Sequence, residues 1–163
     1  MPTVDVIVPV YRNLEATRRC IESVLGSSCR TPFELVVVND GTPEPELARF
    51  LRDLKERGHA TLIEQPSRQG FTAAVNRAFA LHRDRDVVVL QSDAEVANDW
   101  LDRLTPRGDV RAIGVIGTFT NNVGTATYPL PRNDNALPPG LTVATLDALF
   151  ARANPGAAPS CPL

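Results

Sequence analysis

Three residues with chemically useful side chains follow three separate apolar, β-branched runs. Tyr11 follows TVDVIVPV, Asp40 follows FELVVVN, and Asp93 comes after DVVVLQS. Runs of this kind are typical of strands that are buried on both faces of a parallel sheet. Because ligands bind beyond the carboxyl ends of such strands, we expect the three residues to lie together at one edge of the sheet.

An aromatic ring with two carboxylates suits a nucleotide that is carried by a divalent metal. Asp40 is suited to accept a hydrogen bond from a base N–H, and Tyr11 is suited to pack against the ring. Asp93 is suited to ligate Mg²⁺ or Mn²⁺, which often complete their shells with phosphate oxygens and water. The alternative is that Asp40 and Asp93 only cap loops or helix starts. The coincidence of three strand ends favours the ligand site.

The segments that must position these residues alternate between strand and helix patterns. This alternation predicts an α/β fold with right-handed crossovers and a mostly parallel, Rossmann-like sheet flanked by helices. Strands are predicted at residues 3–10, 33–38, 60–63, 86–90 and 112–118, and helices between Asn13 and Gly26, between Thr42 and Gly58, and at residues 71–81, 100–104 and 142–153.

Capping residues mark where two of these helices begin. Asn13 is expected to cap the first helix, and Thr42 the second, with Pro43 at its first helical position. The turn after the first strand lacks GxGxxG, which argues against a dinucleotide-binding site.

Composition limits the class of protein and its partners. The chain has 163 residues, 17 basic against 19 acidic side chains and a net charge of -2, which argues against an electrostatic nucleic-acid binder. No apolar run approaches the roughly 20 residues that span a bilayer, and the N-terminus lacks a secretory leader pattern. Three cysteines form no CxxC pair, so we expect reduced thiols and a cytoplasmic protein.

The character of the chain changes after residue 119. Of the 14 prolines, half lie between Pro129 and Pro162. We therefore divide the chain into an α/β core at 1–119 and a Pro-rich segment at 120–163 that carries loops, a short helix and a tail.

Four segments in order carry a resemblance to a known family. VDVIVPVYRN, ELVVVNDGT, GFTAAVNRAF and DVVVLQSDAEVANDWLDRL resemble the inverting family 2 glycosyltransferases, which have the GT-A fold. The resemblance covers about residues 4–150 and implies transfer of a sugar from a nucleoside-diphosphate sugar to a hydroxyl acceptor, with Mn²⁺ or Mg²⁺ as cofactor. It also suggests a role in polysaccharide biosynthesis, with the protein cytoplasmic or peripheral to the inner face of the membrane.

The resemblance assigns roles to individual residues. It implies that Pro9, Val10 and Tyr11 border the base and that Asp40 bonds to it. Asp93 takes the place of the metal-binding aspartate in the family's DxD-like motif, whose first position is Gln91 here. One carboxylate therefore replaces two, and either Glu95 helps through water or QSD is a permitted variant.

Two further residues are placed near the nucleotide by the same resemblance. Asn76 lies where a family helix approaches the nucleotide. Arg68 can reach a diphosphate through its planar guanidinium, although a solvated loop position is an equal alternative.

No catalytic residue is assigned. The resemblance implies that the general base comes from an acidic motif in a later segment, after an acceptor-binding stretch, and the sequence ends at Leu163 before such a motif. We therefore expect a truncated, donor-binding portion, completed by self-association or a partner chain, with a saccharide or lipid-linked acceptor that the sequence does not identify. The alternative is a noncatalytic nucleotide-sugar-binding or scaffold domain.

Overall fold

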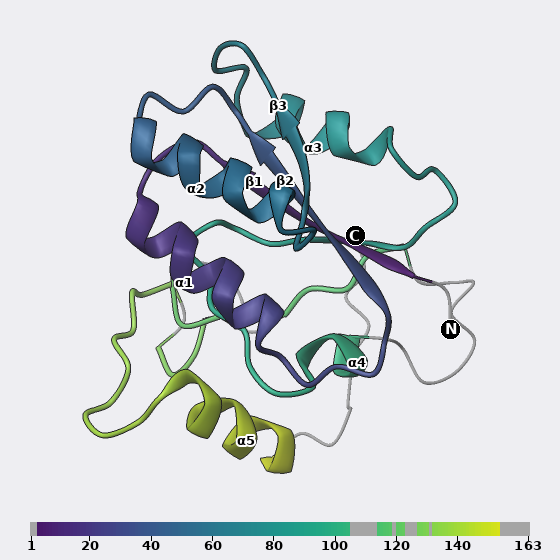
Figure 1. The fold of residues 1–163 in the computed structure, drawn as a ribbon. Helices are drawn as coiled ribbons and strands as arrows, with labels where there is room; N and C mark the ends of the chain where they lie inside the picture. Colours follow the sequence, from purple (N-terminus) through teal and green to yellow (C-terminus); the bar gives the residue numbers. More distant parts are fainter. Residues whose placement is uncertain (1–2, 105–113, 119, 123–126, 131, 154–163) are drawn as a thin grey trace. The chain divides into compact units, whose positions relative to one another are not determined.

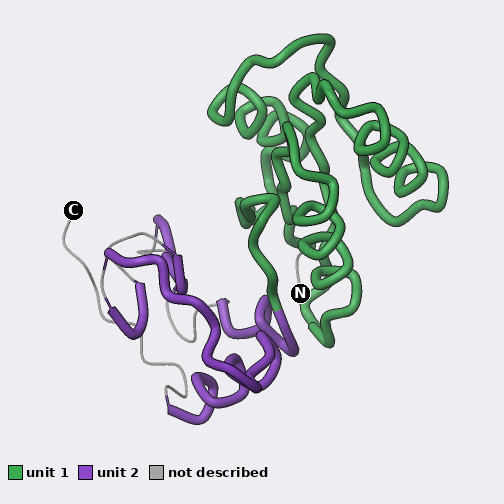
Figure 2. The backbone as a smooth tube through the Cα atoms, turned by 90° about the vertical axis from the view of Figure 1, so that its left-hand side faces the viewer, with its two compact units in different colours: residues 1–96 green, residues 97–163 purple. Residues whose placement is uncertain are grey.

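The computed structural model describes residues 3–104, 114–118, 120–122, 127–130 and 132–153. Contacts divide the chain into two compact units, residues 1–96 and 97–163, which are coloured separately in Figure 2. The division at residue 119 inferred from composition stays a prediction.

The first unit is built on a four-stranded parallel sheet in the order β3-β2-β1-β4. The α/β class predicted from the sequence is confirmed. The central strand β1 pairs with β2 over its whole length, Val4 opposite Phe33 and Val10 opposite Asn39, and with β4 through Asp5 to Ile7. The strands are β1 (Val4–Val10), β2 (Phe33–Asn39), β3 (Thr61–Glu64) and β4 (Val87–Val89).

Helices cover both faces of this sheet (Figure 1). On one face, Ile7, Val36 and Val38 pack against Ala74 and Ala78 of the third helix. The alternate strand residues point to the opposite face, where the first two helices lie. The helices of this unit are α1 (Leu14–Leu25), α2 (Pro45–Glu56) and α3 (Phe71–Phe79).

The second unit contains two described helices, α4 (Trp100–Leu104) and α5 (Val143–Ala153). An ion pair between Arg103 and Asp147, 2.6 Å from Nη2 to Oδ1, joins them. No helix of the described residues is long and apolar enough to cross a membrane.

Two sequence expectations need correction. Thr42 is not the N-cap of α2, because the helix starts two residues later than expected, at Pro45, with Glu44 as its cap residue. The Thr42 hydroxyl instead accepts the Glu44 N–H at 3.2 Å, in the turn before the helix. The fifth strand is absent from residues 114–118, which are described without helix or strand and leave Val115 89% exposed. Residues 112 and 113 of that expected strand lie outside the described residues.

A network of charged side chains around the buried Asp5 lies at the amino-terminal edge of the sheet. Asp5 is 2% exposed, and its two oxygens lie 2.9 Å from Nη1 of Arg85 and 2.9 Å from Nδ1 of His82. The same Nη1 lies 2.7 Å from Oε2 of Glu34, and the Thr61 hydroxyl donates to the other Glu34 oxygen at 2.6 Å. These contacts tie the beginnings of three strands to the loop before β4.

The network favours the ionised form of Glu34. The hydrogen bond from Thr61 and then the one from Arg85 lower the pKa of the Glu34 carboxyl below its usual value. A carboxyl whose pKa is lower in the folded protein stabilises the fold above its unfolded pKa, and this contribution is lost as the pH falls through the folded value.

We expect Glu34→Gln to lower the free energy of unfolding by about 1 kcal/mol at pH 7, because it removes a charged partner of Arg85. Urea denaturation measures the difference, which should shrink as the pH falls below about 4 and the wild-type carboxyl is protonated. Glu56→Gln, on the exposed end of α2, is the matched control and should have little effect. A difference that is the same at pH 3 and pH 7 would contradict this account.

Candidate functional site

The carboxyl ends of β1, β2 and β4 lie at the same edge of the sheet. Asp40 donates its N–H to the Val10 carbonyl at 2.8 Å, so the pairing of β1 and β2 continues to the first residue of the loop. Leu90 likewise donates to the Ile7 carbonyl at 2.9 Å beyond β4. Tyr11, Asp40 and the 91–93 segment therefore emerge at one edge, as the parallel topology requires.

Asp40 is 4% exposed and faces the loop that joins β3 to α3. Its Oδ1 accepts the Gln69 N–H at 2.6 Å, and its Oδ2 accepts the Gly70 N–H at 2.9 Å. Gly70 is the N-cap residue of α3, so this carboxylate also places negative charge at the positive end of that helix. The capping role considered from sequence is thus present. A hydrogen bond from a base to Asp40 stays a prediction. Each carboxylate oxygen can accept a second hydrogen bond besides the one from the loop.

The guanidinium groups of two arginines lie over the Tyr11 ring. The central carbon of Arg68 lies 4.4 Å from the ring centroid, and that of Arg12 lies 5.1 Å from it. Both distances are typical of cation–π contacts. Arg68 is therefore held on an aromatic ring at the strand edge, where its donors suit an anionic ligand.

A hollow of about 190 Å³ opens at the same edge, lined by Pro9, Phe71, Gln91, Ser92 and Asp93. Asp93 is exposed and supplies its only carboxylate. The hollow adjoins the Asp40 loop through the chain itself, because Phe71 follows Gly70 directly. A larger hollow, about 600 Å³, lies between α1 and α2, and none of the predicted site residues lines it.

The other two residues predicted near the nucleotide are Val10 and Asn76. Val10 is 1% exposed, so its side chain belongs to the core and only its backbone borders the edge. Asn76 lies on the exposed side of α3, and none of the described hydrogen bonds involves its side chain. A contact of Asn76 with the nucleotide stays a prediction.

Two side chains of helix α1 contact the acidic 91–95 segment. The Cys20 thiol donates to the Gln91 carbonyl at 3.4 Å, and Arg19 pairs with Glu95 at 3.0 Å. Burial, followed by the nearby charges of Asp93 and Glu95, raises the pKa of Cys20 to about 12, so the thiol is neutral. Glu95 is thus engaged by Arg19, and Asp93 is the carboxylate of this segment that lines the hollow.

The donors around the hollow fit a hard cation. Asp93, Ser92 and Gln91 offer only oxygen as metal ligands, which is the set that Mg²⁺ and Mn²⁺ prefer. A single carboxylate leaves most of the coordination shell to phosphate and water. These three residues would hold the ion.

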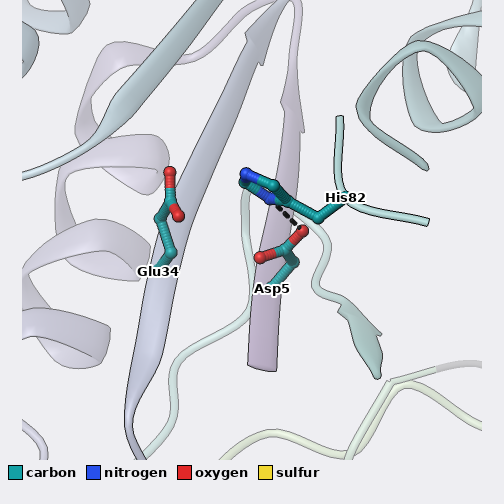
Figure 3. Close-up of side chains that lie close together, drawn as sticks. All are labelled: Asp5, Glu34 and His82. Atoms are coloured by element: carbon teal, nitrogen blue, oxygen red, sulfur yellow. Dashed lines mark hydrogen bonds and ion pairs between the residues drawn. The ribbon is translucent and has the colours of Figure 1, made fainter. Parts of the chain in front are cut away.

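A second group of possible metal ligands lies elsewhere. Atoms of Asp5, Glu34 and His82 lie within 4.8 Å of one another, at the opposite edge of the sheet (Figure 3). Arg85 already donates to both carboxylates, and its charge would repel a cation. We therefore regard this group as the charge network described above. Sequence reasoning missed it, and the only available signal was one charged residue, Asp5, inside an apolar strand.

The family model for glycosyl transferase family 2 matches residues 5–149. Curated relatives include the uncharacterized glycosyltransferase EpsJ of Bacillus subtilis, 25% identical over 117 residues, covering 72% of this chain and 33% of that protein. The O-antigen biosynthesis protein RfbC of Myxococcus xanthus is 36% identical over 84 residues, covering 50% of this chain and 6% of RfbC. The chain thus spans a third or less of the length of these relatives.

Among solved structures, S. aureus TarS 1-349 is similar to this chain with a TM-score of 0.53 and 19% identity. The match covers 61% of this chain and 30% of TarS, and it supports the fold alone. The resemblance seen in the sequence is confirmed by the family model, which spans most of the chain. The chain belongs to glycosyl transferase family 2 and has a GT-A type α/β fold.

Proposed function

We propose that the chain binds a nucleoside-diphosphate sugar with Mg²⁺ or Mn²⁺, as the donor-binding portion of an inverting glycosyltransferase that acts on a hydroxyl acceptor. The observation that carries the proposal is the convergence of Arg68 on Tyr11, the Asp40 loop and the Asp93 hollow at one edge of the sheet. At this edge the Arg68 guanidinium suits phosphate and the Asp93 carboxylate suits a metal. The chain also belongs to glycosyl transferase family 2.

Each residue has a place in this proposal. Pro9 and Tyr11 border the base, and Asp40 accepts a hydrogen bond from it in addition to holding the loop. Arg68 donates to the diphosphate through its planar guanidinium. Asp93 ligates the metal, which, when bound, stabilises the charge that grows on the leaving diphosphate. Asn76 is proposed to lie near the nucleotide on the basis of the family resemblance alone.

Inversion requires the acceptor hydroxyl to approach the anomeric carbon from the face opposite the diphosphate. A carboxylate must take the hydroxyl proton as the bond forms. We assign this role to no residue. Asp147, one of the acids of the second unit, is engaged by Arg103 and the Asn98 side chain. The acceptor-binding and proton-accepting groups are proposed to come from a longer protein, a second copy or a partner chain.

A noncatalytic nucleotide-sugar-binding or scaffold domain is the second candidate. It is favoured by the site itself, where Arg68 on Tyr11 and the Asp93 hollow supply groups for binding and no residue is assigned as a base. The two candidates share the nucleotide site and differ in chemistry. Transfer to an added acceptor, or metal-dependent hydrolysis of the donor, supports the enzyme, whereas binding without either reaction supports the second candidate.

The relatives suggest a setting for the activity. RfbC is named for O-antigen biosynthesis. We propose on this basis that the acceptor is a saccharide or lipid-linked glycan of cell-surface polysaccharide assembly.

The metal role of Asp93 is tested by titrating UDP, GDP and dTDP into the protein with and without Mn²⁺. We expect Mn²⁺ to tighten binding of at least one diphosphate in the wild type and to have no such effect in Asp93→Ala, because the hollow then has no carboxylate. Calorimetry measures both affinities. Asp84→Ala is the matched control, since Asp84 is an exposed acid that precedes β4 rather than following it. If Asp93→Ala keeps the full response to Mn²⁺, the metal site is wrong.

The role of Arg68 is tested by comparing a nucleoside with its diphosphate. We expect Arg68→Ala to weaken diphosphate binding by roughly tenfold or more, because a charge-assisted hydrogen bond to phosphate is worth about 1.5–3 kcal/mol. Binding of the parent nucleoside should change little. Arg83→Ala, an exposed arginine of the loop before β4, serves as the control for lost positive charge. Equal losses for nucleoside and diphosphate would place Arg68 at the base instead.

A further inference from the structure

The loop at residues 65–70 rests on the backbone that follows β2. Both oxygens of Asp40 accept N–H groups of this loop, from Gln69 at 2.6 Å and from Gly70 at 2.9 Å. Gln65 adds a backbone hydrogen bond to the Asn39 carbonyl at 2.9 Å. The loop is therefore attached to β2 at its beginning and at its end.

Because Gly41 has no side chain, the backbone of Ser67 and Arg68 in the middle of the loop lies close to it. Its φ of +65° is a conformation that residues with a side chain rarely adopt. A Cβ at this position would lie 2.5 Å from the Ser67 carbonyl carbon and 2.7 Å from the Arg68 nitrogen. Both are backbone atoms, so no side-chain rotation relieves the clash, and any substituent must displace the loop.

The displaced residues would include Arg68. Its guanidinium lies 4.4 Å from the Tyr11 ring centroid, a contact that depends on where the loop backbone is held. The loop is also braced internally, because the Gln69 side-chain amide donates to the Ser67 hydroxyl at 3.0 Å. A braced loop moves as a unit when its support changes.

We infer that Gly41 and Asp40 are positioning residues that hold the 65–70 loop so that Arg68 lies on Tyr11. Gly41 supplies the space for the loop, and Asp40 supplies the two acceptors that keep it there. The consequence for ligand binding rests on the proposed function, in which Arg68 contacts the diphosphate. The geometry of the loop itself does not rest on it.

The first experiment needs no ligand. In proton NMR, the Arg68 side-chain signals of the full chain should be shifted upfield by the Tyr11 ring, and Tyr11→Leu should abolish this shift. We expect Gly41→Ala to abolish it too. Gly58→Ala is the matched control: Gly58 has a φ of +71°, and nothing lies within 4 Å of a Cβ placed there. It imposes the same backbone strain without the close approach and should keep the shift.

Asp40→Asn provides a second variant in case Gly41→Ala fails to fold. Asparagine keeps one acceptor oxygen but replaces the other with a donor, so one loop N–H loses its partner. We expect amide exchange at Gln69 or Gly70 to quicken by tenfold or more, while amides in the β1–β2 ladder keep their protection. Unchanged exchange and an unchanged Arg68 shift in these variants would overturn the inference.

The second experiment links the loop to the ligand. If Gly41 acts through Arg68, Gly41→Ala should weaken binding of the diphosphate about as much as Arg68→Ala, and should add little in the Arg68→Ala background. Additive losses would overturn the functional part of the inference. A wild-type protein that binds no nucleoside diphosphate would refute the proposed function, and the NMR result would still decide whether Asp40 and Gly41 hold the loop.

Discussion

The structure depends on the pairing of β1 with parallel neighbours on both sides. Because β2 and β4 run in the same direction as β1, the residues that follow all three strands emerge at one edge. Tyr11, Asp40 and Asp93 are remote in sequence and share this edge for that reason alone. The apolar packing of α3 against Ile7, Val36 and Val38 fixes the sheet on which the arrangement is built.

The two edges of the sheet use charge differently. At the amino-terminal edge, Asp5, Glu34, His82 and Arg85 satisfy one another, and their contacts hold strands together. At the carboxyl edge, Asp40 is satisfied by backbone N–H groups, while Asp93 is exposed at a hollow. The first arrangement stabilises the fold, and the second leaves side chains for a ligand.

The sequence predicted the parts of the molecule that depend on local patterns. The first four strand runs, the Asn13 cap of α1 and the stop at Gly26 follow from residue type and spacing, and the structure has them. The strand-end position of the candidate residues followed from the parallel topology. Thr42 was misjudged because Asn39 and Thr42 both form side-chain turns before the helix, which delays its start to Pro45.

Long-range contacts were beyond prediction. Nothing local to NDGT shows that Asp40 accepts hydrogen bonds from residues 69 and 70, or that Gly41 faces Ser67. Arg68 on Tyr11 and Arg85 between two carboxylates also join segments far apart in the chain. Such contacts can be identified only from the three-dimensional structure, in which the segments between the strands have folded back on the sheet. Residue type alone did not distinguish Asp40, a buried helix cap, from Asp93, an exposed ligand candidate.

The inward orientation of Asp40 has a consequence for how ligands approach. Its charge is buried at the start of α3, where the N–H groups of Gln69 and Gly70 compensate it. The charged groups exposed at this edge include the guanidinium groups of Arg12 and Arg68 on the Tyr11 ring and the carboxylate of Asp93. An anion that approaches the Tyr11 ring meets the guanidinium groups and not the Asp40 carboxylate, which faces the 65–70 loop. Such a field steers encounters over about one Debye length, roughly 8–10 Å at moderate ionic strength, and added salt weakens it. Arg12 and Arg68 on the Tyr11 ring thus favour the encounter with an anion, and the exposed Asp93 opposes it until a cation is bound.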